Sequence, residues 1–279
     1  MLEKYCPGFL QVHYIYLIIH EYQMTIKALS DLRKQIITAS SLSNEGHIPS
    51  AFSILEILYT IYVSIPTKFK LVFDKDFDFV LSKGHGSLAL YAVLNASGFI
   101  DDNWVNDFCK NNSNYGGHPD RTKVNGVVAS TGSLGHGLPI TIGRILANRM
   151  KQIKNRSYCL VGDGELNEGS NWESFMLAEN LSLEELCLIV DLNKSTLRSI
   201  SVLNVRAKLE SFGFEVYVVD GHDLEKLEKV LSMPLGKSPM AIIAETIKGK
   251  GLKDMENSFY WHHRSPNKTQ LTNFIGEIE

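Results

Sequence analysis

A chain of 279 residues is long enough for one large domain with a sizeable buried core. The net charge of −3 gives no electrostatic reason to expect nucleic acid or an anionic membrane as a partner. Hydrophobic residues make up 44% and charged residues 21%, which is typical of soluble globular proteins. The four cysteines form no CxxC pair, which favours reduced thiols and a cytoplasmic location.

Residues 1–23 are expected to form a peripheral N-terminal extension. The apolar run at residues 14–19 is six residues long, whereas a bilayer span needs about 20. There is no basic leader and no small-residue cleavage site, which argues against a signal peptide. Residues 24–279 are expected to form a single domain, because no repeat or linker divides them.

The first helix is predicted from about Thr25 to Ser41, with Ile26, Leu29, Leu32 and Ile36 on one side. A second helix is predicted over Ala51–Val63, and a third over Glu168–Asn180. Five short apolar runs are predicted to be strands: Phe77–Leu81, Tyr158–Val161, Leu186–Val190, Glu215–Val219 and Ala241–Ile243.

The predicted strands are almost continuously hydrophobic, which is typical of parallel strands covered on both faces. Segments of at least 20 residues separate them, enough for helical crossovers. The pattern therefore predicts an α/β fold with a doubly wound, mostly parallel sheet and helices on both faces. Ligands of such sheets bind outside the carboxyl ends of the strands.

A Gly-Asp-Gly sequence, Gly162–Gly164, directly follows one of these strands. The glycines allow a sharp turn and close approach of a bulky anion, and Asp163 supplies an oxygen ligand suited to a hard cation. Asn193 follows the next predicted strand, thirty residues after Asp163. If the two strands are adjacent, both side chains lie at the same sheet edge. An ordinary strand-to-helix turn is the alternative for Gly-Asp-Gly alone.

The Gly-Asp-Gly sequence and the later Asn resemble the signature of thiamine-diphosphate enzymes, and further motifs resemble transketolases. These motifs occur in family order between about Thr25 and Asn267: Gly46-His-Ile48, Leu81-Ser-Lys-Gly-His-Gly86, Gly116-Gly-His-Pro-Asp120, Ser130-Thr-Gly-Ser-Leu-Gly-His-Gly137, Lys248-Gly-Lys-Gly-Leu252 and Trp261-His262. The chain is accordingly identified as a member of the transketolase family.

The resemblance implies a thiamine-diphosphate-binding domain of the diphosphate-binding type, with Mg²⁺ or Ca²⁺ bridging the cofactor diphosphate. The implied metal ligands are Asp163, Asn193 and the backbone carbonyl of Ser195. The cofactor-binding residues implied are His85, Gly132, Ser133, Leu134, Gly135, Gly162, Asp163, Gly164, Glu165, Asn193 and His262.

His47, His118 and His262 are implied to be catalytic: His47 and His118 are expected to face the sugar substrate, and His262 is expected to line the cofactor. Imidazoles with a pKa near neutrality can move protons or donate hydrogen bonds to sugar hydroxyls. Glu168 and Glu173 match the family's subunit-contact glutamates. His136 is expected to be structural.

The sequence departs from the family pattern at three places. The segment after Asn193 lacks the usual glycine-containing continuation and is shorter. Asp191-Leu-Asn193 replaces a more usual Asp-Asn-Asn or Asp-Asp-Asn, and His263 stands where the family commonly has glycine. These changes indicate a specialised substrate, and His263 could contact a phosphate or narrow the entrance.

Full-length transketolases continue with a pyrimidine-binding domain that supplies a glutamate to the cofactor. We therefore expect the partner to be a separate C-terminal transketolase subunit, in an α2β2 assembly, and no activity without it. The expected function is transfer of a two-carbon ketol unit from a ketose phosphate to an aldose or aldehyde. Two alternatives stay open: a subunit of another thiamine-diphosphate enzyme (1-deoxyxylulose-5-phosphate synthase-like or E1α-like), or a non-catalytic cofactor-binding subunit.

Overall fold

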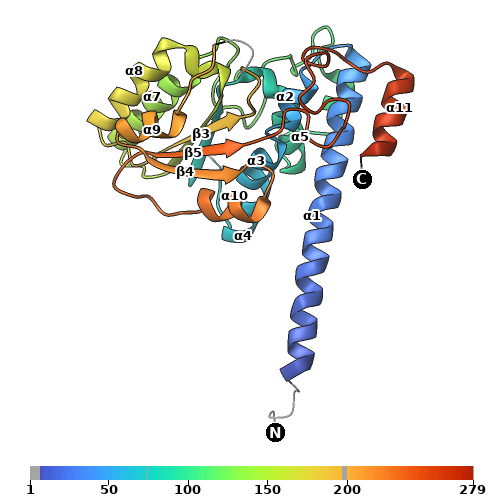
Figure 1. Ribbon diagram of the computed structural model, residues 1–279, viewed down its shortest axis with the longest axis horizontal. Coiled ribbons are helices and arrows are strands. Elements are labelled where there is room, and N and C mark those ends of the chain that lie inside the picture. Colours follow the sequence, from blue (N-terminus) through green and yellow to red (C-terminus); the bar gives the residue numbers. More distant parts are fainter. Residues whose placement is uncertain (1–6, 74, 197–199, 279) are drawn as a thin grey trace.

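A five-stranded, fully parallel sheet forms the centre of the computed structural model, which describes residues 7–73, 75–196 and 200–278, and side chains only from residue 23 onward. The spatial order is β1-β2-β3-β5-β4 (Figure 1). The strands are β1 (Phe77–Leu81), β2 (Arg156–Gly162), β3 (Leu186–Leu192), β4 (Glu215–Asp220) and β5 (Met240–Glu245). All five predicted strands are confirmed, each with bounds within a few residues of the prediction.

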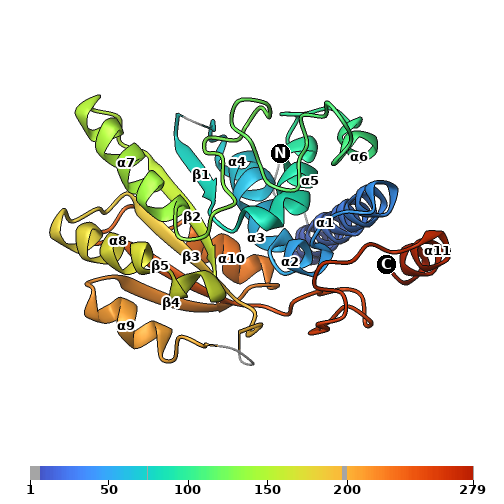
Figure 2. The ribbon, with the colours of Figure 1, turned by 90° about the horizontal axis from the view of Figure 1, so that it is seen from above.

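Helices cover both faces of the sheet (Figure 2). On one face lie α7 (Gly137–Met150), α8 (Gly169–Asn180) and α9 (Val205–Ser211). The other face carries α1 (Pro7–Ser43), α2 (Ile48–Phe52), α3 (Leu55–Tyr59), α4 (Ile65–Phe69), α5 (Ser87–Ala96) and α10 (Leu224–Leu231). Short α6 (Trp104–Asp107) and the C-terminal α11 (Lys268–Glu277) both contact α1. The predicted doubly wound fold is confirmed.

The two faces have separate hydrophobic cores, because side chains alternate along each strand. On β3, Cys187 and Ile189 belong to the core beneath α1–α5 and α10, whereas Leu186, Leu188 and Val190 belong to the core beneath α7–α9. All five are fully buried. The nearly continuous hydrophobicity of the run thus follows from burial on both faces.

The first helix begins at Pro7, so the prediction that it begins near Thr25 is wrong. Its N-terminal half extends away from the body of the molecule (Figure 1). Leu29, Leu32 and Ile36 pack in the core as predicted, but Ile26 is 42% exposed. The domain boundary at residue 24 stays a prediction. No helix in the described part of the chain is long and apolar enough to cross a membrane.

The second predicted helix is broken into α2, α3 and a wide turn at Thr60–Ser64 that precedes α4. Pro66 accounts for the wide turn, since a proline has no N–H to donate to the carbonyl four residues earlier, but it lies too far along the chain to cause the break at residues 53–54 between α2 and α3. That carbonyl belongs to Tyr62, and it accepts a hydrogen bond from the Ser97 hydroxyl at 3.1 Å instead. The side chain of Ser97 therefore compensates for the bond that the proline removes.

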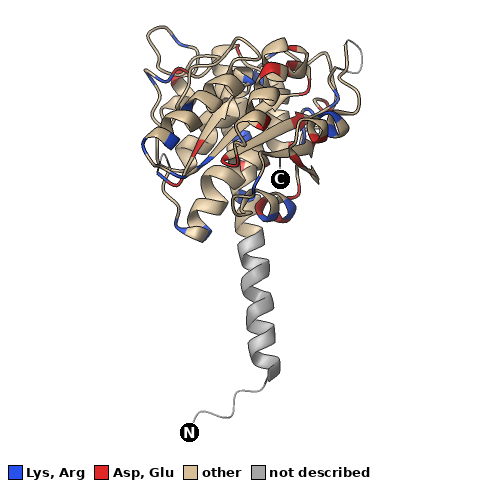
Figure 3. Cartoon of the chain, turned by 90° about the vertical axis from the view of Figure 1, so that its left-hand side faces the viewer, with Lys and Arg blue, Asp and Glu red and all other residues tan. Residues whose placement is uncertain are grey.

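Charged side chains of both signs are distributed over the body of the molecule (Figure 3). Of the four cysteines, Cys159 and Cys187 are free and buried in strands, and Cys109 is free and half-buried. Cys6 lies outside the described residues. The described cysteines therefore agree with the expected reduced thiols.

Replacing Ile189 with Ala should destabilise the protein strongly. Ile189 is fully buried in the central strand, so the change removes buried apolar surface and leaves a cavity, at a cost of about 2–5 kcal/mol. Urea unfolding gives the free energy directly. Val218→Ala on the edge strand β4, where the side chain is 44% exposed, is the matched control and should cost less than about 1 kcal/mol. Equal losses for both variants would contradict the two-sided burial of β3.

Candidate functional site

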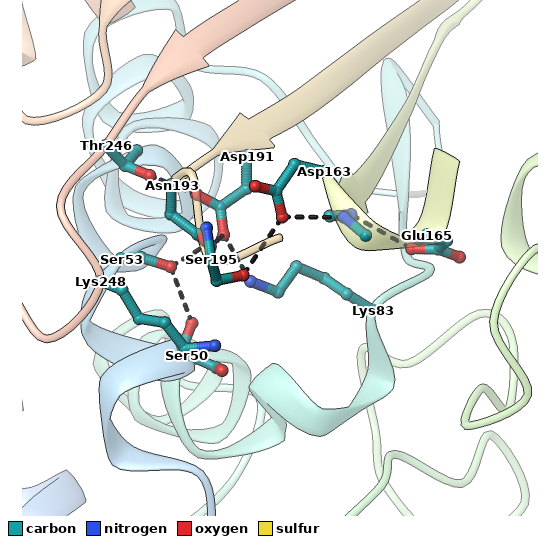
Figure 4. A network of polar contacts seen from close by, with 12 residues as sticks. Ser50, Ser53, Lys83, Asp163, Glu165, Asp191, Asn193, Ser195, Thr246 and Lys248 are labelled. Atoms are coloured by element: carbon teal, nitrogen blue, oxygen red, sulfur yellow. Dashed lines mark hydrogen bonds and ion pairs between the residues drawn. The ribbon is translucent and has the colours of Figure 1, made fainter. Parts of the chain in front are cut away.

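The carboxyl ends of four strands bring polar side chains to one edge of the sheet (Figure 4). Lys83 follows β1, Asp163 follows β2, and Asp191 and Asn193 lie at the end of β3. Lys248 follows β5. After β3 the chain continues on one face of the sheet, and after β5 it continues on the other, so a topological switch point lies between these neighbouring strands. Ligands of such folds bind at the switch point.

The predicted metal ligands lie together, as the sequence predicts. The hydroxyl of Ser195 lies 3.3 Å from Asp163 Oδ1, and the backbone amide of Ser195 donates a hydrogen bond to Asn193 Oδ1 at 3.0 Å. Asp163 is 5% exposed and also accepts a hydrogen bond from the Gly164 amide. Among the described residues no basic side chain lies within ion-pair distance of Asp163. Its buried negative charge therefore fits a hard cation, and the Asn193 amide oxygen nearby is a second ligand of the type that such a cation binds.

Asp191 orients the amide of Asn193. The Asp191 carboxylate is fully buried and accepts hydrogen bonds from Ser53, Thr246 and Asn193 Nδ2 and a charged one from Lys83. Burial alone would raise the pKa of Asp191, but the Lys83 ammonium lowers it below its ordinary value. Because Asn193 Nδ2 is bound to Asp191, its oxygen is the atom that faces Ser195.

The predicted histidines form a cluster at the same edge. The His47 ring lies 5.4 Å from that of His85 and 5.7 Å from that of His262, measured between ring centroids. Burial and the neighbouring positive charges lower the pKa of His47 to about 4 and that of His85 to about 2. Both rings are thus neutral at pH 7. The exposed His118 ring packs against Gly132, where an added Cβ would lie 3.4 Å from the ring.

The additional histidine, His263, joins this cluster. Its ring lies 4.5 Å from that of His47, and its Nε2 lies 3.5 Å from the Glu45 carboxylate. Its side chain is 57% exposed. His263 therefore stands at the rim of the cluster, and both expectations from the sequence, contact with a phosphate and a narrower entrance, stay predictions.

Lys248 supplies a positive charge to the cavity. Its amine lies 3.1 Å from His262 Nδ1, and burial lowers its pKa to about 8. Among the described residues no carboxylate lies within ion-pair distance of this amine. The cavity measures about 320 Å³ and is lined by Asn193, Lys194, Ser195, Lys248, Asn257, Ser258, Phe259 and His262.

The predicted cofactor loop, Gly132–Gly135, lies against the turn after β2. The Gly135 amide donates to Glu165 Oε1 at 2.9 Å, and Gly162 donates to Glu165 Oε2 at 3.2 Å. Ser82 also donates to Glu165, and burial raises the pKa of this carboxyl group. Glu165 thus connects the predicted cofactor loop to the turn after β2, and its side chain accepts hydrogen bonds from other residues of the protein.

Glu168 and Glu173 lie at the start of α8, Glu168 as the residue that precedes the helix. Both are exposed, and so are Met176 and Leu177 farther along α8, at 47% and 43%. Ile140 on the neighbouring α7 is 39% exposed. This surface combines carboxylates with apolar side chains. His136, expected to be structural, is exposed, and its ring lies 3.0 Å from the Leu134 carbonyl of its own loop.

Three site residues were given no role from the sequence: Lys83, Asp191 and Lys248. Lys83 and Lys248 belong to two of the transketolase-like motifs, and Asp191 directly follows the apolar run Leu186–Val190. The signal that could have found them is a charged residue at the carboxyl end of a strand buried on both faces. Such a charge needs a partner or a ligand.

Binding of an inorganic pyrophosphate–Mg²⁺ complex should weaken as pH rises from 7 to 9. Lys248 is protonated below its pKa of about 8 and loses its charge above it, which removes attraction for the anion. Calorimetric titration at several pH values measures the effect. Pyrophosphate itself also changes its protonation over this pH range, so the contribution of Lys248 is isolated with the variant Lys248→Met. This variant should bind pyrophosphate–Mg²⁺ roughly tenfold more weakly than the unsubstituted protein at pH 7. A variant that binds as tightly as the unsubstituted protein would contradict this role.

Comparison with known proteins identifies a family. The sequence model described as "Transketolase, thiamine diphosphate binding domain" matches residues 23–271. Among curated proteins, one subunit of the apulose-4-phosphate transketolase of Actinobacillus succinogenes is 34% identical over 263 residues, covering 91% of this chain and 95% of that protein. Human transketolase is 34% identical over 274 residues, covering 92% of this chain but 43% of that protein.

Solved structures agree with the sequence comparison. Transketolase from Campylobacter jejuni superposes with a TM-score of 0.81 at 26% identity, covering 91% of this chain and 43% of that one. The chain thus spans less than half of full-length transketolases and nearly the whole of the Actinobacillus subunit. The predicted family is confirmed: the chain belongs to the transketolase family and corresponds to its thiamine-diphosphate-binding domain.

Proposed function

We propose that this chain is the diphosphate-binding subunit of a two-component transketolase. With its partner it transfers a two-carbon ketol unit from a ketose phosphate to an aldose or aldehyde acceptor. The observation that carries the proposal is the convergence of Asp163, Asn193, Lys248 and the histidine cluster at one sheet edge, in a chain that matches the transketolase domain over residues 23–271.

Asp163, Asn193 and the Ser195 carbonyl would hold Mg²⁺, and Lys248 would face the diphosphate. The chemistry of this donor set supports the assignment, since Mg²⁺ favours a few oxygen ligands and keeps positions for water and phosphate oxygens. Ca²⁺ takes the same ligand types, so the donor set fits both ions. The buried charge of Asp163 and the positive charge of Lys248 suit a metal and an anion that lie side by side.

Thiamine diphosphate supplies an electron sink for breaking and forming carbon–carbon bonds. The chain's own residues would bind and orient the sugar and move its protons. His47 and His262 are placed to do so, because burial lowers the pKa of each and keeps its ring neutral at pH 7. A neutral imidazole can accept a hydroxyl proton at one nitrogen and donate a hydrogen bond from the other. His118 packs against Gly132 of the predicted cofactor loop.

A separate C-terminal transketolase subunit would complete the site. A relative of matching length is named as one subunit of a transketolase, which supports a two-chain enzyme. The exposed Glu173, Met176 and Leu177 on α8 offer a mixed carboxylate and apolar surface for the second chain. We propose an α2β2 assembly in the cytoplasm, with Glu168 and Glu173 at the contact between the two kinds of chain.

The test is ketol transfer from xylulose 5-phosphate with thiamine diphosphate and Mg²⁺. The chain should be inactive alone and active when mixed with a chain that carries the pyrimidine-binding domain, sought first in the adjacent reading frame. Turnover by the single chain would contradict the partner requirement. Decarboxylation of pyruvate by the mixture would favour another thiamine-diphosphate enzyme, and cofactor binding without any turnover would favour a non-catalytic subunit.

Asp163→Asn should abolish stabilisation by the cofactor and metal. For the unsubstituted chain, thiamine diphosphate at 100 times its Kd with saturating Mg²⁺ adds about 2.7 kcal/mol of stability, which raises Tm by roughly 5 °C. Asn lacks the charge that holds the metal, so the shift in Tm should fall near zero. Glu184→Gln, which removes an ion pair with Lys154 outside the site, is the control and should keep the shift. A normal shift in Asp163→Asn would remove Asp163 from the metal ligands.

A further inference from the structure

A buried triad of charged side chains, Arg33, Glu56 and His222, lies beside the site without facing it. Arg33 comes from α1, Glu56 from α3, and His222 from the turn after β4. Their side chains are 12%, 6% and 10% exposed. Arg33 forms an ion pair with Glu56 Oε1, and His222 Nδ1 lies 3.0 Å from Glu56 Oε2. The function proposed above uses none of the three.

The hydrogen bonds of His222 determine its tautomer. Its Nε2 accepts a hydrogen bond from the Ile247 amide at 2.9 Å, so this nitrogen carries no proton. The ring proton is then on Nδ1 and is donated to Glu56. Burial alone would raise the pKa of Glu56, but the hydrogen bond from His222 and the charge of Arg33 lower it, so the carboxylate is charged and accepts both. A carboxylate that fixes a histidine tautomer in this way also fixes the ring's direction.

The triad contacts the backbone on both sides of Lys248. His222 accepts from the Ile247 amide, and Arg33 Nε donates to the Lys250 carbonyl at 3.3 Å. The segment between them turns tightly: Gly249 has a φ of +85°, and a Cβ there would lie 2.3 Å from the Met255 carbonyl oxygen. Lys248 thus lies in a short backbone turn, and the ion-paired triad forms a hydrogen bond to the backbone at each end of this turn.

We propose that His222 is a positioning residue, which holds the Lys248 amine toward the site by accepting the Ile247 amide, with Glu56 and Arg33 fixing its ring. The inference rests on the proposed function for what Lys248 binds. A long, flexible lysine side chain loses less freedom on binding an anion when its backbone is already fixed. Loss of the His222 acceptor should therefore weaken anion binding without removing any group that touches the anion.

Two substitutions separate the two nitrogens of His222. In His222→Gln the amide oxygen reaches the position of Nε2 and can still accept from Ile247. In His222→Asn the shorter side chain reaches Glu56 but leaves the Ile247 amide without its partner. A hydrogen bond contributes up to about 1.5 kcal/mol, so His222→Asn should bind pyrophosphate–Mg²⁺ up to roughly tenfold more weakly. His222→Gln should stay within about threefold of the unsubstituted chain.

Nitrogen-15 NMR of the unsubstituted chain tests the geometry directly. Long-range ¹H–¹⁵N spectra should show an unprotonated Nε2 and a protonated Nδ1 in His222, and the Ile247 amide should shift in His222→Asn more than in His222→Gln. A proton on Nε2 would overturn the proposal even if the variants failed to fold. So would equal pyrophosphate affinities for the two variants. If the unsubstituted chain binds neither pyrophosphate nor thiamine diphosphate, the proposed function fails while the NMR result still decides the role of His222.

Discussion

The buried carboxylate of Asp191 is the constraint on which the site depends. Lys83 holds its pKa low, so the group carries a charge where water does not reach it. Such a charge is tolerated only when it is paired and fully hydrogen-bonded. Its partners come from the ends of β1 and β5, from Ser53 after α2, and from Asn193 beyond β3. The hydrogen bonds to the Asp191 carboxylate therefore hold together segments that are distant in sequence, and they orient the Asn193 side-chain oxygen toward Ser195.

Two buried lysines at this edge have different roles because their partners differ. Lys83 is neutralised by Asp191, whereas Lys248 has a neutral neighbour, His262, and a pKa of about 8. The positive charge left at Lys248 suits an anion and also helps keep the nearby His47 neutral. A single arrangement thus provides an anion site and uncharged imidazoles next to it. The triad that includes His222 lies behind Lys248 and fixes its backbone.

Much of the fold could be predicted from the sequence, and the failures have local causes. Short apolar runs separated by long crossovers leave few choices for strands buried on both faces, so all five were found. The periodic apolar pattern of the second helix predicts a continuous helix, but the helix is broken at residues 53–54, and the hydrogen bond that Pro66 cannot form leaves a wide turn at Thr60–Ser64. The first helix begins at Pro7 although residues 14–19 are mostly β-branched and aromatic, types with a lower helix propensity, so propensity does not predict where it starts.

The sequence by itself determined the strands, the Gly-Asp-Gly turn, the residues Asp163 and Asn193, and the family, because these depend on local pattern and on motif order. Only the tertiary structure decided which charges are buried, which partner each has, and hence that Lys248 and not Lys83 keeps a free positive charge. The physical reason is that a pKa or a hydrogen-bond partner depends on the groups within a few ångströms. At this site those groups are distant in sequence: Ser53 and Asp191, for example, are 138 residues apart.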